Sequence, residues 1–143
     1  MSVLFDTSAL VAALISSHPQ HHVARACLLE HINNADVEVC VSTHALVELF
    51  AVLTRFPQWR VRADTAQAII EGIRPRVTVI ALTEDDYVWV LKHVTSLELV
   101  GAVVYDGLHA RAALKAGVTT LYTLNTKDFM RLGDAVARLV ASP

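Results

Sequence analysis

Long apolar runs, a strong charge of one sign and paired cysteine motifs are all missing from this chain of 143 residues. Its apolar stretches, such as 9–15 and 99–105, are interrupted well before the ~20 residues that a membrane-spanning helix needs. The net charge is only −2, so no global electrostatic field attracts nucleic acid. We therefore expect no contact with a membrane, and any contact with RNA or DNA must come from a local site or from bound cations.

Cysteine is scarce, and the two present, Cys27 and Cys40, form no CxxC pattern. Because the N-terminus also carries no secretory signal, we predict a reduced pair of thiols and a cytoplasmic location. Apolar residues are plentiful, at 54% against 18% charged, and this balance excludes intrinsic disorder. The length is that of one domain, so a single domain over residues 1–143 is predicted, with a substantial core.

Short β-rich runs alternate along the chain with longer segments of helical periodicity. Strands are predicted at 3–5, 37–41, 77–82 and 118–123. The predicted helices follow the caps Thr7-Ser8, Ser42-Thr43 and Thr83, and otherwise occupy 21–32, 62–73 and 103–116. Residues 136–140 are either a short last strand or a helical tail. Continuously apolar strands separated by helices predict a parallel sheet covered on both faces, which is an α/β fold.

Four of the 14 acidic residues stand where a solvated surface position is not the obvious expectation. Asp6 closes the first strand, Glu48 lies in an apolar helix, Asp106 is near a helix start, and Asp128 follows the fourth strand. Singly, each has a structural interpretation, as a helix cap, an exposed helix position, a dipole partner or a turn. Ligands bind beyond the carboxyl ends of parallel strands, however, so acids meeting there predict a functional cluster.

Clustered carboxylates have a defined chemistry. They raise one another's pKa unless a cation neutralises them, and such hard oxygen ligands favour Mg²⁺, with Mn²⁺ as a substitute. Two such ions ~4 Å apart can stabilise both the attacking and the leaving oxygen of a phosphodiester displacement. This chemistry needs no nucleophilic side chain and no phosphate loop, and the sequence has neither a P-loop nor a G-x-S-x-G motif.

At these four acids the chain resembles the PIN-domain nucleases, and among them the VapC-type toxins of prokaryotic toxin–antitoxin pairs. Four motifs carry the resemblance, in order: Phe5-Asp6-Thr7-Ser8-Ala9-Leu10, Val47-Glu48-Leu49, Tyr105-Asp106-Gly107-Leu108-His109-Ala110 and Thr123-x-Asn125-x-x-Asp128-Phe129. Each motif alone is weak, but four with matching order and spacing are specific. One departure is Gly107, where the family more often has alanine. Glycine there should loosen the helix start by up to ~1 kcal/mol without changing the ligands.

The resemblance covers essentially all 143 residues and implies a three-layer PIN-like sandwich whose parallel sheet has four to five strands in the order 3-2-1-4-5. It also implies an Mg²⁺-dependent endoribonuclease that acts as a toxin on translation and growth, a VapB-type antitoxin and a homodimer. Carried over by position, Asp6, Glu48, Asp106 and Asp128 are the catalytic metal ligands, and Thr7, Ser8, Thr123 and Asn125 support them. We expect hydrolysis by a metal-activated water that leaves a 5′-phosphate and a 3′-hydroxyl.

Basic residues near the predicted site are candidates for contact with RNA. Lys127 and Arg131 flank the fourth acid, where they can meet phosphate. Arg60 belongs to an arginine-rich stretch beside Trp59, which can provide a backbone contact with a stacking platform or simply be charged surface. Both interpretations of this stretch stay open.

Histidines also occur in places that invite a ligand role. His18, His21 and His22 flank a proline without acids or cysteines at ligand spacing, so a solvated surface is the plainer interpretation. His109 lies about one turn after Asp106, where it could approach the site, but an ordinary helix-face position is the plainer prediction for it.

Other functions compete with the toxin. Within the nuclease class, an rRNA-processing PIN enzyme is the nearest, and a catalytically idle PIN-like scaffold is a third option. A phosphoacceptor or phosphatase-like domain belongs to a different class, but Asp6-Thr7-Ser8 lacks the second acid of a D-x-D pair. The apolar stretches 45–53 and 66–73 are either antitoxin and dimer surface or simply buried.

Overall fold

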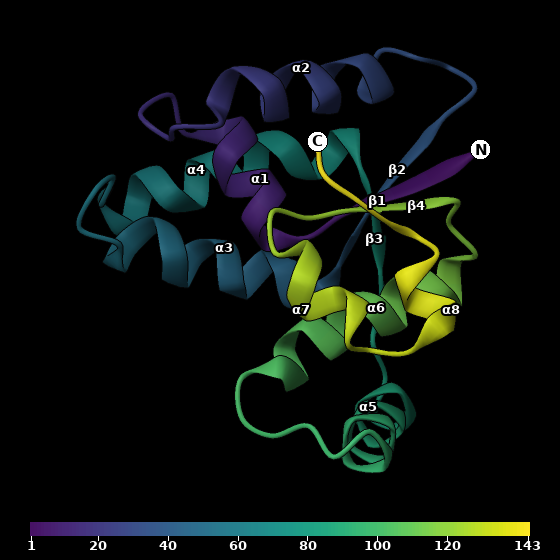
Figure 1. Cartoon of the computed structure of the whole chain (residues 1–143). Coiled ribbons are helices and arrows are strands. Elements are labelled where there is room, and N and C mark those ends of the chain that lie inside the picture. The colour runs from purple at the N-terminus through teal and green to yellow at the C-terminus, as the bar shows by residue number, and fades with distance from the viewer.

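The sheet has five parallel strands in the order β3-β2-β1-β4-β5 in the computed structural model, which describes residues 1–143 (Figure 1). The strands are β1 (Ser2–Phe5), β2 (Glu38–Ser42), β3 (Thr78–Ile80), β4 (Thr120–Tyr122) and β5 (Val140–Ala141). The α/β class and the order 3-2-1-4-5 are therefore confirmed. Strands β3 and β4 are shorter than predicted, and before each of them a backbone N–H bonds back to the preceding turn or helix, Val77 to Arg74 and Val118 to Ala113.

Eight α-helices and one 3-10 turn connect these strands. They are α1 (Thr7–Leu14), α2 (His21–Ile32), α3 (Thr43–Arg55), α4 (Ala63–Ile73), η1 (Arg74–Arg76), α5 (Glu84–Ser96), α6 (Val103–Ala116), α7 (Thr126–Met130) and α8 (Asp134–Ala137). Both alternatives for the C-terminal segment are partly right, since residues 134–137 are helical and residues 140–141 form a strand. No helix of the chain has the length and hydropathy that crossing a membrane requires.

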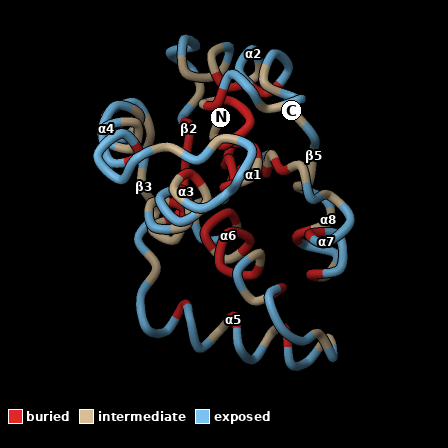
Figure 2. Tube along the Cα trace, turned by 90° about the vertical axis from the view of Figure 1, so that its left-hand side faces the viewer, coloured by how far each residue is buried: buried red, intermediate tan, exposed pale blue.

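Two hydrophobic clusters cover the two faces of the sheet. Successive residues of β1 alternate between them, with Val3 and Phe5 in the cluster under α1 to α4 and Leu4 in the cluster under α5 to α8. Figure 2 shows the buried positions gathered in the central elements, whereas α5 and α2 expose much of their length. Strands buried on both faces explain why the sequence reads as continuous apolar runs rather than as an alternating pattern.

Side chains at the ends of β1 and β2 cap the helices that follow these strands. Asp6, rather than the predicted Thr7 or Ser8, caps α1 by accepting the backbone N–H of Ala9 at 2.9 Å. Ser42 caps α3 as predicted, accepting from Ala45 at 3.1 Å. The interpretation of Asp6 as a helix cap is confirmed and that of Thr7 and Ser8 as caps was wrong, because the acid itself stands at the strand-to-helix turn, where a carboxylate satisfies a free N–H and interacts favourably with the helix dipole.

Gly107 has a packing role that the sequence did not reveal. A Cβ at this position would lie 2.8 Å from the Val90 Cγ1 atom, so the glycine lets α5 approach α6 closely. The expectation that glycine merely loosens the start of α6 was wrong, because position 107 lies inside the helix against a neighbouring helix.

Candidate active site

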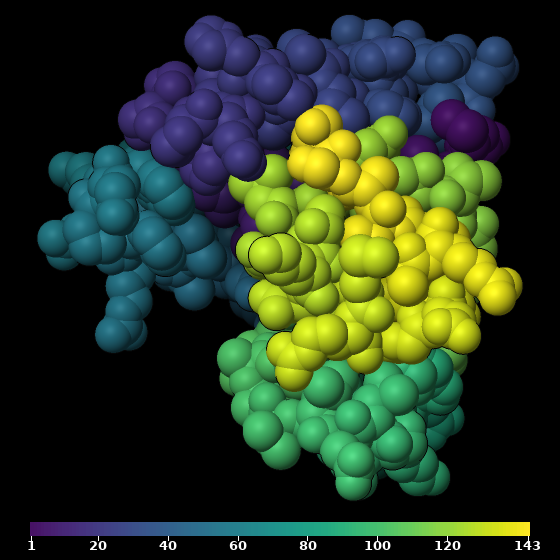
Figure 3. Space-filling view, in the orientation of Figure 1, coloured from purple at the N-terminus to yellow at the C-terminus, as the bar shows by residue number.

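The carboxyl ends of β1 and β4 meet the N-terminal parts of α3 and α6 at one edge of the sheet. Asp6, Glu48 and Asp106 line one cavity at this edge. Glu48 and Asp106 also line an adjoining hollow that reaches Asp128. Figure 3 shows the surface hollowed between the blue-teal surface of α3 and α4 and the yellow-green surface of α7. The four predicted acids are therefore neighbours in space.

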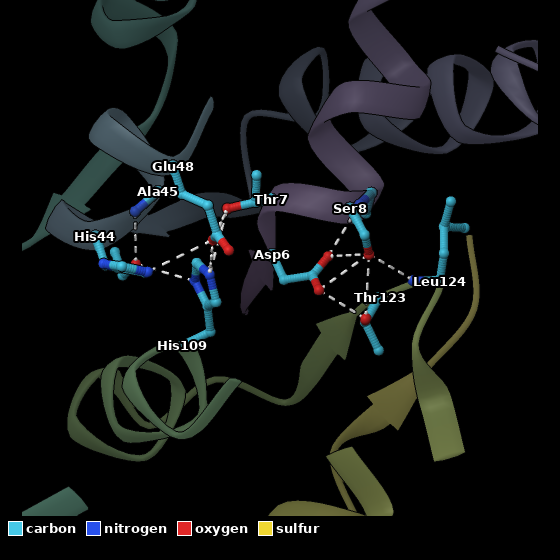
Figure 4. Close-up of polar contacts among 11 residues, drawn as sticks. Asp6, Thr7, Ser8, His44, Ala45, Glu48, His109, Thr123 and Leu124 are labelled. Atoms are coloured by element: carbon cyan, nitrogen blue, oxygen red, sulfur yellow. Dashed lines mark hydrogen bonds and ion pairs between the residues drawn. The ribbon is translucent and has the colours of Figure 1, made fainter. Parts of the chain in front are cut away.

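Asp6 is held rigidly at the end of β1. Its carboxylate is 2% exposed and accepts hydrogen bonds from Ser8 Oγ at 2.8 and 3.0 Å and from Thr123 Oγ1 at 2.7 Å (Figure 4). Burial raises the pKa of this carboxyl despite the charge of His109 and the hydrogen bonds, which lower it. The predicted supports Ser8 and Thr123 thus fix the Asp6 side chain, and Thr123 ties it to β4.

Glu48 is held by a different pair of residues. Thr7 Oγ1 donates to Glu48 Oε2, and His109 Nε2 lies 2.7 Å from the same oxygen (Figure 4). Burial raises the pKa of Glu48, but the hydrogen bonds and charge of His109 and the Thr7 hydroxyl outweigh it, so the net pKa is lowered. Thr7 supports Glu48 rather than Asp6, because consecutive residues of α1 point to different sides.

His109 is a functional residue whose approach to the site was the less favoured of two interpretations of the sequence. Its side chain is 2% exposed, and its Nδ1 lies 3.0 Å from Ser42 Oγ at the end of β2. The prediction of an ordinary helix-face histidine was wrong, because residues 107–110 make a full turn of α6 that is buried on every side. The small residues Gly107 and Ala110 on either side were the signal of an interior position.

Asp106 is half-buried and differs from Asp6 and Glu48 because its side chain makes no hydrogen bond or ion pair within the chain. Burial and the negative charges of Asp6, Asp128 and Glu48 raise its pKa to about 7, against the lowering effect of His109. A carboxyl in this state is poorly neutralised by the protein itself. Such a group gains most from a cation that enters the site.

The last motif lies at the rim. Asp128 is 53% exposed, stands on α7 and pairs with Arg131, whose Nη1 lies 3.6 Å from its Oδ1. Asn125 lines the cavity, but its side chain makes no hydrogen bond, so its supporting role stays a prediction. Lys127 is exposed on the same helix, while Arg60 is exposed at the opposite end of the cavity beside Trp59. No contact of these cations with RNA is tested by this geometry.

A further histidine completes the site. His44 Nε2 lies 3.7 Å from Glu48 Oε2, is buried, and has no hydrogen-bond partner. Ligand atoms of His44, Glu48 and His109 all lie within 4.8 Å of one another. The signal that could have found His44 is its i,i+4 spacing from Glu48 on α3.

The residues present fit a divalent cation. The cluster joins four carboxylates, one of them unpaired, with His109 as the basic group that lowers the pKa of its acids. Carboxylate oxygens suit Mg²⁺ and Mn²⁺. Asp6 and Asp106 line the same cavity, which no lysine or arginine lines, so the cation would supply charge that the chain lacks.

Comparisons with known proteins agree with this arrangement. Residues 3–135 match the family model described as the PIN domain. The chain is similar to three solved structures, all under 25% identical, which show its fold. The complex VapBC2 from Rickettsia felis, bound to a DNA fragment from its promoter, has 21% identity, a TM-score of 0.69, and coverage of 99% of this chain and 98% of that one.

The second structure, the sarcin–ricin loop cleaving toxin VapC20 of Mycobacterium tuberculosis, has 19% identity and a TM-score of 0.71, with 88% of this chain and 92% of that chain covered. The third, VapBC-1 from nontypeable Haemophilus influenzae, has 18% identity and a TM-score of 0.67, with 99% and 98% covered. None of the curated proteins compared with the chain matches it.

Proposed function

Because the chain belongs to the PIN-domain family, we propose that it is a metal-dependent endoribonuclease and the toxin of a toxin–antitoxin pair. The observation that carries the proposal is the cluster of four acids at the carboxyl edge of the sheet, with Asp106 unpaired inside it. The similar structures include a toxin that cleaves the sarcin–ricin loop, which supports RNA as the substrate class.

Asp6, Glu48 and Asp106 would hold Mg²⁺, with Asp128 contributing at the rim. When bound, Mg²⁺ would supply positive charge for the phosphate oxygens and lower the pKa of a water ligand. Ser8 and Thr123 keep both Asp6 oxygens fixed.

The second group of residues prepares Glu48. His109 and Thr7 orient its carboxylate, and its lowered pKa keeps it ionised at neutral pH, so it can accept a proton or a hydrogen bond. Ser42 bonds to the other ring nitrogen of His109 and thereby fixes the ring. Together these side chains hold the acidic groups in place before substrate arrives, which is the main contribution a protein makes to phosphodiester hydrolysis of this kind.

The test is cleavage of a short single-stranded RNA by the purified protein. We expect products with a 5′-phosphate and a 3′-hydroxyl in MgCl₂ and none in excess EDTA. Asp6→Ala should abolish cleavage, whereas Asp85→Ala, at an exposed acid of α5, should not. Full activity in the Asp6→Ala protein, or undiminished activity in EDTA, would contradict the proposal.

Of the alternative functions, the phosphoacceptor domain gains no support. Receiver-like sheets have the order 2-1-3-4-5, whereas this sheet has the order 3-2-1-4-5. An rRNA-processing role uses the same site chemistry, and mapping the cleaved RNA in cells distinguishes it from a toxin.

An antitoxin would need a docking surface near the site. Val47 is 65% exposed and Phe50 is 40% exposed on α3, where they line a groove with Ile70 of α4. The expectation that the apolar stretch 45–53 is simply buried is therefore wrong for these side chains. We propose that this groove takes an apolar antitoxin segment. Homodimerisation is a separate proposal, and light scattering of the purified chain decides it.

A further inference from the structure

The acid cluster continues into a cavity that has an aromatic wall. This cavity of about 310 Å³ is bounded by the acids at one end and, at the other, by His18, Phe56 and Trp59. Its volume is at the small end of the range for small-ligand sites, which run from about 300 to 1,000 Å³. A ligand in it would touch the aromatic rings and the carboxylates together.

The aromatic wall consists of one stacked pair, Phe56 and Trp59, and a third ring, His18, that is tilted against Trp59. The ring centroids of Phe56 and Trp59 are 4.8 Å apart with planes 7° apart, and the His18 ring lies 5.3 Å from Trp59 at 39°. The expectation that His18 is solvated surface was wrong, because the turn after α1 folds it half-buried against Trp59. Phe56 keeps 45% of its surface exposed, so the stack presents an open face.

Backbone hydrogen bonds fix the segment that carries this wall. The Phe56 N–H donates to the Val52 carbonyl at 3.1 Å, and the Trp59 N–H donates to the Phe56 carbonyl at 3.2 Å. The Val61 N–H donates to the Leu53 carbonyl at 2.9 Å, which ties the end of this segment to α3. The rings are thus presented by an ordered turn, which reduces the entropy lost when a ligand binds.

The wall suits a flat uncharged ring better than a phosphate. Burial and the neighbouring His21 lower the pKa of His18, so its ring is neutral at pH 7. The indole N–H of Trp59 is buried without an acceptor. An unpaired buried donor costs about 1–3 kcal/mol, so the fold itself leaves one polar atom of this wall unsatisfied.

We propose that the wall of His18, Phe56 and Trp59 binds one unpaired nucleobase of the RNA, next to the phosphodiester bond that the acids cleave. The proposal rests on the nuclease function, and it adds that the RNA must present an unpaired base at the site of cleavage. A base stacks on an aromatic face whatever its sequence, and this contact is worth about 1–3 kcal/mol per base. Bases of a duplex are stacked inside it, so the substrate is a single strand or a loop whose base can turn outward.

The first test uses fluorescence of Trp59 and does not depend on cleavage. Trp59 and Trp89 are the two tryptophans of the chain, so Trp89→Phe leaves Trp59 as the single reporter. This protein is titrated with a nucleoside 5′-monophosphate and, separately, with ribose 5-phosphate, which lacks the base. We expect quenching by the nucleotide, which should bind about tenfold more tightly than ribose 5-phosphate.

Matched variants assign the effect to the wall. Phe56→Ala should abolish the preference for the nucleotide. If the alanine variant does not fold, Phe56→Leu serves in its place, because leucine keeps the apolar volume without an aromatic face. Tyr87→Ala should keep the preference, because Tyr87 is similarly exposed but lies on α5 and does not line the cavity. Equal affinity for the two ligands, no change in Trp59 fluorescence, or a preference that survives both Phe56 variants would overturn the proposal.

The second test uses cleavage. An abasic substitution at one nucleotide beside the cut should lower kcat/KM about tenfold in the wild type, with little further loss in the Phe56→Ala protein. Equal losses in both proteins at every position would overturn the base pocket while leaving the nuclease function intact. A chain that binds nucleotides with the expected preference but cleaves no RNA would instead contradict the nuclease function alone.

Discussion

Two acids in the first turns of neighbouring helices, Asp86 of α5 and Asp106 of α6, have opposite environments. Asp86 is 2% exposed, and the chain neutralises it fully: Lys115 Nζ lies 2.6 Å from one carboxylate oxygen and Arg111 Nε lies 2.8 Å from the other. With the Thr83 backbone N–H, these contacts hold the pKa of Asp86 well below its usual range. Asp106 has no such partner, and its pKa is raised to about 7.

Both cations that neutralise Asp86 belong to α6, the helix that also carries Asp106. The helix therefore directs its positive charge toward α5 and away from its own first turn. Pairing by cations of the chain therefore distinguishes a structural acid from a functional one. A buried acid that the chain has paired stabilises the fold, whereas one that the chain leaves among other acids requires a cation from outside.

The largest effect should come from removing the unpaired charge. Asp106→Asn should lower the rate of RNA cleavage by about 10³-fold, the upper end for loss of one preorganised electrostatic contact. Its stability should not fall, since the change relieves repulsion from Asp6 and Glu48. Single-turnover cleavage kinetics measure the loss, with Asp85→Asn as the exposed-acid control. Unchanged cleavage in Asp106→Asn would show that Asp106 is not a functional acid.

Removing the paired charge should instead affect the fold. Asp86→Ala leaves Arg111 and Lys115 without their partner, so the free energy of unfolding should fall by about 3 kcal/mol. This is the low end for a broken buried pair, because both cations reach solvent. Urea unfolding measures it, with Asp85→Ala as the control, and a loss no larger than in that control would show that the ion pairs are not structural.

The contact between the two helices can be tested at Gly107. Gly107→Ala places a Cβ 2.8 Å from Val90 Cγ1, and this overpacking should cost about 1–3 kcal/mol. Gly72→Ala in α4 has open space around it and should stabilise the helix by up to about 1 kcal/mol. Thermal unfolding of the two variants should therefore shift in opposite directions; a shift of both toward higher stability would refute the packing role of Gly107.

The two acids should also respond to pH with opposite signs. The Asp106 pKa is raised from 3.8 to about 7, so the folded state binds more protons, and the stability this group contributes at pH 4 is lost as the pH rises through 7. The Asp86 pKa is lowered from 3.8, so its contribution is present above that value and lost below it.

Melting temperatures between pH 4.5 and 8 in EDTA test the first of these signs. Asp106→Asn should remove part of the decline of stability toward pH 8 that the wild type shows, while Asp85→Asn should follow the wild type. Parallel curves for the wild type and Asp106→Asn would show that the ionised Asp106 side chain does not destabilise the folded state.

Much of the acidic site was predictable from the order of strands and acidic residues along the chain. An apolar strand that ends in Asp6 places that acid at the carboxyl edge, and the motif around Asp106 places the second acid beside it. Parallel strands bring such positions together whatever the rest of the sequence does.

The rest depends on side-chain directions that a one-dimensional pattern does not contain. Thr7 and Ser8 are adjacent, but they serve different acids because successive helical residues point about 100° apart. His109 reaches Glu48 only because α6 packs beside α3. The two residues of β5 form a strand through pairing with β4 rather than through their own propensity.

Calorimetric titration of Mg²⁺ into the purified chain tests the central claim most directly, since it asks whether the unpaired acid requires a cation. We expect saturable binding to the wild type, at least tenfold weaker binding to Asp106→Asn, and unchanged binding to Asp85→Asn. Equal Mg²⁺ affinity in the wild type and Asp106→Asn, or no Mg²⁺ binding by the wild type, would contradict it.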